Sequence, residues 1–270
     1  MADLSPKRYG KDYYQQEFGL DELQRFNMHW WSVRFYARLA DRLLRRHGGR
    51  RVLEIGCAHG YTLARLEARH ETWGIDLSDY AIGRARTIAP RSRVFCADFT
   101  ADLPPQIEAG GFDLIIAKYV LEHLADPEKA LHRAFSLLAP GGRLLYSVPN
   151  MDSPGRRFKG RKWYAFGDET HVSLLERHEW IELTRRTGFE IERTFSDGLW
   201  DMPYLEWMPT ALQYPIFCLP TVVTVFFARP MLPSRWGENL IVVARRPAEK
   251  ASSAQGPDDS AVAALRSRDS

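Results

Sequence analysis

Glycine and acidic residues recur early in the chain at a spacing that suits nucleotide binding. Gly56 and Gly60 bound the turn in Val-Leu-Glu-Ile-Gly-Cys-Ala-His-Gly (52–60), directly after a run of branched apolar residues. Glycine lets a backbone approach a ligand closely, and the first strand-to-helix turn of an open α/β sheet is where such ligands bind. Asp76 ends the next apolar run and Asp98 follows the third, so carboxylate acceptors are expected at the same edge of the sheet.

The glycine spacing excludes two common nucleotide sites. A dinucleotide fingerprint, G-x-G-x-x-G, counted from Gly56 needs glycine where the chain has Ala58 and Tyr61. NAD is therefore not expected. A P-loop is excluded as well, because no Gly-Lys-Ser/Thr follows the turn.

Two histidines are candidate catalytic residues. His123 ends the stretch Lys-Tyr-Val-Leu-Glu-His (118–123), after the expected fourth strand, and His171 lies in the loop after the fifth. An imidazole titrates near neutral pH and could take a proton from a hydroxyl or an amine. Structural roles are the alternatives: His123 could orient backbone through hydrogen bonds, and His171 could contact the start of the following helix.

The elements that position these residues follow from alternation. Apolar runs separated by helical stretches predict a mostly parallel sheet with helices on both faces. Seven strands are expected, with an apolar insertion at about 199–237 between the last two. The runs cover 51–56, 72–78, 93–98, 112–120, 142–150, 190–198 and 238–246.

A family resemblance rests on these motifs. Residues 54–60 match E-x-G-x-G-x-G with Ala58 in the place of the middle glycine, and Pro140-Gly141-Gly142 falls in register further on. Residues 50–150 closely resemble class I S-adenosylmethionine-dependent methyltransferases. The resemblance implies a Rossmann-like fold and S-adenosyl-L-methionine as the cofactor.

The resemblance also assigns roles within the cofactor site. Glu54 would lie near the ammonium group and Gly56 to Gly60 under the methionine part. Asp76 would accept from both ribose hydroxyls, and Asp98-Phe99 would meet the adenine. The full expected set of cofactor-binding residues is Tyr14, Glu54, Gly56, Cys57, Gly60, Asp76, Leu77, Asp98, Phe99 and Lys118.

Within the family, Leu-Glu-His-Leu-Ala-Asp-Pro (121–127) is most similar to the small-molecule group that includes the ubiquinone-pathway O-methyltransferases. Some members of that group bind a divalent metal through two acidic residues and the histidine that corresponds to His123. Here Tyr119 occupies the first acidic position. One carboxylate and one imidazole are a thin ligand set for magnesium, so no metal is expected.

Three domain segments are expected. Residues 1–47 form a helical arm over the cofactor site, with Tyr13 and Tyr14 folding over the cofactor as in related enzymes, or else packing on the core. Residues 48–247 form the methyltransferase domain. The tail, 248–270, is small and polar and is expected to be disordered.

The acceptor side is expected to be apolar with a basic border. No charged residue occurs from Trp207 to Ala228, but Pro209, Pro215 and Pro220 are expected to break a membrane-spanning helix there. Two interpretations of this apolar stretch remain: a lid over a hydrophobic acceptor, or a patch at 203–233 that rests on a membrane surface.

The loop after the expected fifth strand is basic, with Arg156, Arg157, Lys159, Arg161 and Lys162. This basic loop could bind anionic lipid headgroups or a substrate phosphate, or it could simply be solvated.

Bulk composition narrows the function class. The net charge is only +3 although 26% of the residues are charged, so the protein has no strong positive field that would attract nucleic acid. No nucleic-acid partner is therefore expected. Three scattered cysteines and no apolar leader in the first residues predict a cytoplasmic protein, with contact to the inner membrane face as a further expectation. The expected activity is methyl transfer to a hydroxyl, less readily an amine or carbon, of a hydrophobic or lipid-like small molecule. The alternative is a non-catalytic cofactor-binding partner subunit.

Overall fold

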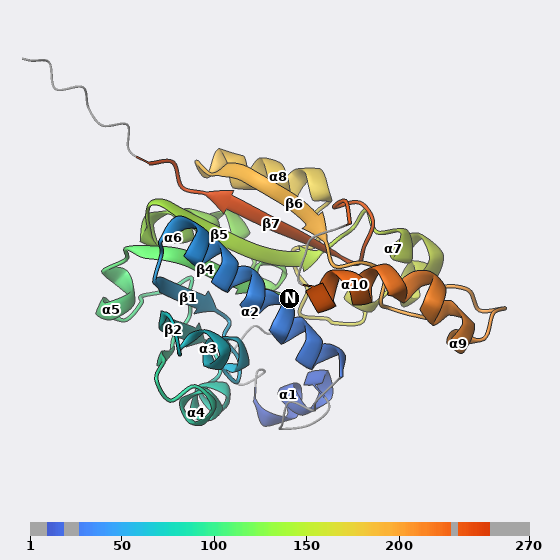
Figure 1. Cartoon of the computed structure of the whole chain (residues 1–270), viewed down its shortest axis with the longest axis horizontal. Helices are drawn as coiled ribbons and strands as arrows, with labels where there is room; N and C mark the ends of the chain where they lie inside the picture. The colour runs from blue at the N-terminus through green and yellow to red at the C-terminus, as the bar shows by residue number, and fades with distance from the viewer. Residues whose placement is uncertain (1–9, 19–26, 228–231, 249–270) are drawn as a thin grey trace, which may run out of the picture.

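The central element is a seven-stranded sheet in the order β3-β2-β1-β4-β5-β7-β6 (Figure 1). The computed structural model describes residues 10–18, 27–227 and 232–248. Strand β7 runs antiparallel to both of its neighbours, and the other neighbouring strands pair in parallel. The predicted fold class is confirmed. The strands are β1 (Arg51–Ile55), β2 (Glu71–Asp76), β3 (Arg93–Cys96), β4 (Phe112–Lys118), β5 (Leu138–Pro149), β6 (Glu190–Ser196) and β7 (Asn239–Arg245).

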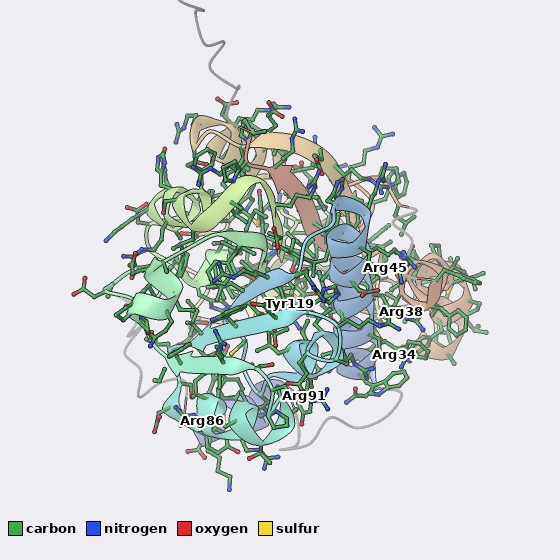
Figure 2. The ribbon with its side chains drawn as sticks, turned by 60° about the vertical axis from the view of Figure 1, so that its left-hand side comes forward. Arg34, Arg38, Arg45, Arg86, Arg91 and Tyr119 are labelled. Atoms are coloured by element: carbon green, nitrogen blue, oxygen red, sulfur yellow. The ribbon has the colours of Figure 1, made fainter. Side chains whose placement is uncertain are left out.

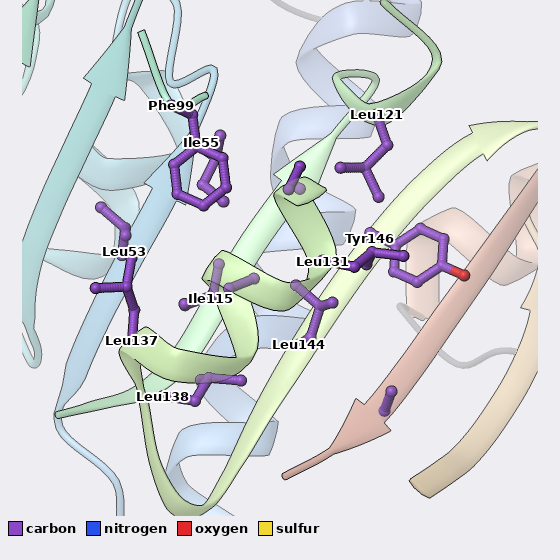
Figure 3. Close-up of a cluster of buried hydrophobic side chains, with 14 of the residues drawn as sticks. Leu53, Ile55, Phe99, Ile115, Leu121, Leu131, Leu137, Leu138, Leu144 and Tyr146 are labelled. Carbon is purple, nitrogen blue, oxygen red and sulfur yellow. The ribbon is translucent and has the colours of Figure 1, made fainter. Parts of the chain in front are cut away.

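Helices cover both faces of this sheet (Figure 1). On one face, α6 places Leu131 and Leu137 against Leu53, Ile115 and Leu144 of the sheet (Figure 3). Removing such side chains from water supplies most of the driving force for folding. The helices are α1 (Lys11–Phe18), α2 (Met28–His47), α3 (Tyr61–Leu66), α4 (Asp79–Ile88), α5 (Pro105–Glu108), α6 (Pro127–Leu137), α7 (Pro154–Lys159), α8 (Arg177–Arg186), α9 (Thr210–Gln213) and α10 (Leu219–Phe227).

Helix α2 covers the opposite face. It begins at the Asn27 cap, whose side chain accepts from the Trp30 N–H, and ends at Gly48 in a left-handed conformation. Its buried face, which includes Phe35 and Leu39, packs on Val52 and other sheet residues as a second core cluster. The segment expected as an arm thus contains a helix of the main core, and only α1 lies apart from it. The expected disordered tail falls outside the described residues, apart from Ala248.

The insertion between β6 and β7 contains a continuous helix over residues 210–227, and the expectation that its prolines would break it is wrong. Helix α9 passes through a π-helical turn, Tyr214–Cys218, directly into α10. Pro209 precedes the first turn, where a missing N–H costs nothing. Pro215 lies in the π turn and Pro220 in the first turn of α10, so the helix continues past both prolines.

Glu238, just before β7, ties the insertion to the loop after β5. Its buried carboxylate accepts hydrogen bonds from Ser153 Oγ (2.9 Å), from Trp163 Nε1 (2.5 Å) and from the Tyr204 hydroxyl. Burial raises the pKa of Glu238, and the three donors act in the opposite direction. The backbone at Gly155 approaches so closely that a Cβ there would lie 1.9 Å from Glu238 Oε1.

Replacing Glu238 should therefore loosen the whole acceptor side. We expect Glu238→Ala to lower the free energy of unfolding by about 3 kcal/mol or more, because three buried donors lose their acceptor together. Tyr204→Phe removes one of those bonds together with the bond from the Asp201 N–H to the same hydroxyl, and should cost only about 2 kcal/mol. Urea unfolding of both variants measures the difference, and equal losses would show that Glu238 does not organise this region.

Candidate active site

A cavity of about 940 Å³ lies at the carboxyl ends of the parallel strands and collects nearly all of the expected site residues. Gly60 is the exception and does not line it. Its backbone starts α3 at φ +77° beside Ala85, so its role is in the turn. The expected residues that do line the cavity are Tyr14, Glu54, Gly56, Cys57, Asp76, Leu77, Asp98, Phe99, Lys118, His123 and His171.

The glycine corner is held in left-handed backbone. Gly56 has φ +65°, and a Cβ there would lie 2.4 Å from Val120 Cγ2, so only glycine fits without movement. Ala58 adopts φ +47° despite its Cβ. That conformation costs roughly 1 kcal/mol for a residue other than glycine. In return, the Ala58 N–H points at the Asp76 carboxylate and donates to Oδ2 at 2.8 Å.

Asp76 is a buried, pre-oriented acceptor. Its Oδ1 accepts from the Ser78 N–H at 2.9 Å and from the Tyr14 hydroxyl at 3.2 Å. Burial raises the pKa of Asp76, although these donors favour its charged form. Tyr14 from α1 also lies beside the His59 ring, with centroids 4.9 Å apart. A ribose hydroxyl binding at Oδ1 would thus meet Tyr14 on the same oxygen.

Two further charged groups face the cavity from β1 and β4. Burial raises the pKa of Glu54 to about 7, while the Lys118 charge and a hydrogen bond from Thr62 oppose that rise. Glu54 Oε2 has no hydrogen-bond partner among the described residues. Burial lowers the pKa of Lys118, and the Glu54 charge acts against this. A carboxylate and an ammonium group side by side could bind the two opposite charges of a small zwitterion.

The residues after β3 form the remaining wall of the cofactor side. Asp98 is exposed, and its Oδ1 accepts from the Thr100 N–H and hydroxyl, both at 2.7 Å. Phe99 is buried next to it and offers an apolar face. These positions suit a planar heterocycle with an exocyclic amine, because a carboxylate only accepts.

His123 and His171 lie together, with ring centroids 4.7 Å apart. The Thr170 hydroxyl donates to Asp168 Oδ1 at 2.6 Å, so His123 Nδ1, 2.7 Å from Thr170 Oγ1, must be the donor in that pair. His171 Nδ1 donates to the Ala165 carbonyl at 2.7 Å. Both imidazoles therefore carry their neutral-state proton on Nδ1 and keep a lone pair on Nε2.

Charge distinguishes the two rings. Burial and the neighbouring His171 lower the pKa of His123 to about 4. Burial would raise the pKa of Asp168, but hydrogen bonds from Thr170 and the charges of the two histidines outweigh burial, so the pKa is lowered. Its Oδ2 lies 3.7 Å from His171 Nε2, which would stabilise a proton on that nitrogen.

Glu122 completes the cluster. It is fully buried, burial raises its pKa to about 8, and neither carboxylate oxygen has a hydrogen-bond partner among the described residues. Its carbonyl accepts from the Val172 and Ser173 N–H groups and so holds the His171 loop in place. One ligand atom each from Glu122, His123 and His171 lies within 4.8 Å of the others, a set that could hold a metal ion. The absence of a metal stays a prediction.

The acceptor side contains polar residues that the sequence analysis did not single out. Asp197, after β6, accepts from Asn239 Nδ2 at 2.6 Å and from Trp200 Nε1 at 3.1 Å. Asn239 also donates to the Tyr119 hydroxyl at 3.1 Å. Burial raises the pKa of Asp197 to about 7. The sequence did offer a signal for these residues: Asp197 directly follows β6 and Asn239 begins β7, and these two strand ends meet at the cavity.

Tyr119 stands out in its backbone as well. Its φ is +55°, which is rare for a bulky residue and is found mostly where surrounding structure enforces it. The Tyr119 N–H donates to the Ser147 carbonyl, and its ring packs on Tyr36 with centroids 6.2 Å apart. Aromatic rings from α2, from the residue after β4 and from the insertion, namely Tyr36, Tyr119 and Phe226, thus line this end of the cavity.

The raised pKa of Glu122 predicts a pH-dependent stability. In the folded protein this pKa is about 8 against an ordinary value of 4.5, so its contribution is fully present below pH 4.5 and is lost as the pH rises through 8. Glu122→Gln cannot ionise. We expect its melting temperature to gain on that of the wild type from about pH 5.5 to about pH 9.

Calorimetry at several pH values measures this difference. Glu182→Gln is the matched control, because Glu182 is exposed on α8 and the charge change is the same. A constant gap between Glu122→Gln and wild type across that pH range would mean that Glu122 is already ionised and partnered in the folded protein.

Comparison with known proteins agrees with this geometry. A family model described as "Methyltransferase domain" matches residues 24–194, more than half of the chain. The chain is 34% identical over 143 residues to a "Ubiquinone biosynthesis O-methyltransferase" of Aromatoleum aromaticum, covering 51% of this chain and 58% of the relative. It is 31% identical over 157 residues to a probable S-adenosylmethionine-dependent methyltransferase of Mycolicibacterium smegmatis, covering 57% of each.

The chain therefore spans a little over half the length of these relatives. Among solved structures, the magnesium protoporphyrin IX methyltransferase of Synechocystis, with bound SAH, shares the fold at a TM-score of 0.58 and 17% identity, covering 89% of this chain and 97% of that one. The resemblance inferred from the glycine corner is confirmed. The chain belongs to the methyltransferase-domain family of class I, S-adenosylmethionine-dependent methyltransferases.

Proposed function

We propose that this protein transfers the methyl group of S-adenosylmethionine to a hydroxyl of a hydrophobic, ring-containing small molecule. The observation that carries the proposal is that one cavity joins the Asp76 corner to the histidine pair and to a chamber lined by aromatic side chains. The relatives named as ubiquinone biosynthesis O-methyltransferases support a hydroxyl as the acceptor atom.

The residues of the cofactor side fit S-adenosylmethionine. The buried Glu54 oxygen without a partner suits an ammonium group, and the Asp76 carboxylate suits a pair of ribose hydroxyls. Phe99 supplies an apolar contact for the adenine. The bound cofactor would supply an electrophilic methyl group on a sulfonium, and the chain would supply binding, alignment and exclusion of water.

The histidine pair supplies the base. His171 Nε2 is available to take the hydroxyl proton, and the Asp168 carboxylate 3.7 Å away stabilises the imidazolium that results. His123 has a lowered pKa, stays neutral, and can accept a hydrogen bond from the acceptor through Nε2. The Thr170 hydroxyl between Asp168 and His123 fixes the orientation of both.

Cofactor binding can be tested without an acceptor. Calorimetric titration should show saturable binding of S-adenosylmethionine and S-adenosylhomocysteine and none of NAD. Asp76→Ala should weaken both by about tenfold or more, because charged hydrogen bonds to the ribose are lost. The control Asp79→Ala changes the same residue type at an exposed neighbouring position and should bind normally. No binding of either sulfur compound to the wild type would refute the proposed cofactor.

The base can be tested on prenylated phenols and catechols, with release of S-adenosylhomocysteine as the readout. His171→Gln should lower kcat by about 100-fold or more, whereas His178→Gln, at an exposed histidine on α8, should not. Asp168→Asn should also lower kcat, because the imidazolium formed on proton transfer loses its counter-charge. Activity should persist in excess EDTA.

Two outcomes would contradict this assignment. An unchanged kcat in His171→Gln would remove His171 as the base. Loss of activity in EDTA with recovery in Mg²⁺ would mean that Glu122, His123 and His171 act as metal ligands, and the metal-independent reaction would then be wrong.

A further inference from the structure

The insertion helix has its polarity inverted. Its outward face carries large apolar side chains that are 52 to 58% exposed: Leu212, Tyr214, Ile216, Leu219, Val222, Phe226 and Phe227. Just before the helix, Trp207 is 77% exposed. A helix on a protein surface in water normally shows the reverse, with its apolar stripe inward. Exposed apolar patches of this kind mark contact with another apolar phase.

The inward face of the same helix carries buried polar side chains, Gln213, Thr221 and Thr224, and the first two are hydrogen-bonded by the protein. Gln213 is fully buried, and its amide bonds the backbone of Tyr204, Leu205 and Met208. The Thr221 hydroxyl donates to the Leu199 carbonyl at 3.1 Å. The outward face is therefore not a surplus of hydrophobic residues that the core failed to bury, because polar residues occupy the buried positions.

The helix is long enough to span a bilayer, yet it is fixed along the protein. Residues 210–227 reach a mean hydropathy of 1.5 over 18 residues, which meets the requirement for length and composition. However, Arg38 and Arg42 of α2 donate to the carbonyls of Phe226 and Phe227, each at 2.8 Å. Figure 2 shows Arg38 on the side of α2 that faces the insertion helix. The strands on either side of the insertion pair in one sheet. This arrangement suits a helix that lies in a membrane interface with one face immersed.

Basic residues border this face. The loop that contains α7 packs on the insertion, with the rings of Phe158 and Phe217 6.2 Å apart and Lys162 paired with Glu206 at 2.6 Å. Arg157 and Arg161 of that loop are exposed. Cationic side chains beside an immersed apolar helix match anionic headgroups. A symmetric contact between two copies would instead bring this basic border against itself.

The same helix forms a wall of the cavity. Thr221, Val222, Val225 and Phe226 all line it, and Val222 and Phe226 are also exposed. We infer that the outward face of α9–α10 docks on an anionic phospholipid bilayer, so that the acceptor enters the cavity from the lipid phase beside α10. The docking stands on the helix itself, whereas the entry of an acceptor rests on the proposed function.

Flotation of the full chain with vesicles tests the docking. Wild-type protein should float with vesicles of about 30% phosphatidylglycerol in phosphatidylcholine, and less with phosphatidylcholine alone. Ile216→Gln/Leu219→Gln should lower partitioning by about tenfold or more, because two immersed side chains become polar. Arg157→Ala/Arg161→Ala should lower it about fivefold per arginine and weaken its salt dependence.

The matched control is Ala101→Gln/Ala109→Gln, at exposed positions before and after α5, a helix that lies apart from α10 (Figure 1). It should float like the wild type. Equal flotation of the Ile216/Leu219 variant and the wild type, or no flotation of the wild type, would overturn the inference. So would a wild-type dimer that this variant converts to a monomer without any vesicle binding, because the face would then join two copies.

Failure of the docking can be separated from failure of the proposed function. Each variant is titrated with S-adenosylhomocysteine, and normal binding shows that the fold and cofactor site are intact. Wild-type protein that floats but binds no S-adenosylhomocysteine would refute the proposed function alone. Wild-type protein that binds S-adenosylhomocysteine but does not float would refute the docking alone.

Discussion

The direction of β7 decides where the parts of this molecule meet. Because β7 runs antiparallel between β5 and β6, it must start at the edge of the sheet where the parallel strands end. That edge carries the glycine corner and the histidine pair. Everything between β6 and β7 therefore leaves and returns at the mouth of the cavity. Glu238, at the return point, fastens this connection to the loop after β5.

Several carboxyl groups of the cavity wall are buried without enough hydrogen bonds or positive charges to keep them ionised. Glu54, Glu122 and Asp197 all have a pKa raised to about 7 or 8 by burial, so near neutral pH each is partly or largely uncharged. Burying an isolated charge is far more costly than protonating it. Glu54 faces the Lys118 charge on the cofactor side, whereas Glu122 and Asp197 lie with aromatic rings on the other side of the cavity, and a partly or largely uncharged wall there favours an apolar guest.

Local sequence was enough to predict the sheet and the meeting of Gly56, Asp76 and Asp98 at one edge of it. Each strand is a short apolar run, and Gly56, Asp76 and Asp98 follow such runs directly, so their meeting at one edge needs only the topology. The relay from Asp168 through Thr170 to His123 depends on a contact 47 residues apart in the chain, which no local pattern reveals. The path of the helix through Pro215 depends on a π turn, and the proline rule alone gives the wrong answer.

Helix α2 connects the cavity wall to the end of the insertion helix. It has 20 residues, which makes it about 30 Å long. Its first turns, with His29 and Trp31, face the cavity, and Trp31 packs on Phe226 of the insertion at 5.8 Å between ring centroids. Arg38 and Arg42, further along, hold the last carbonyls of α10. Three positions along α2 thus hold the same end of α10, so the place of α10 beside the cavity follows the place of α2, and inserting one turn into α2 between Trp31 and Arg38 would break one set of these contacts.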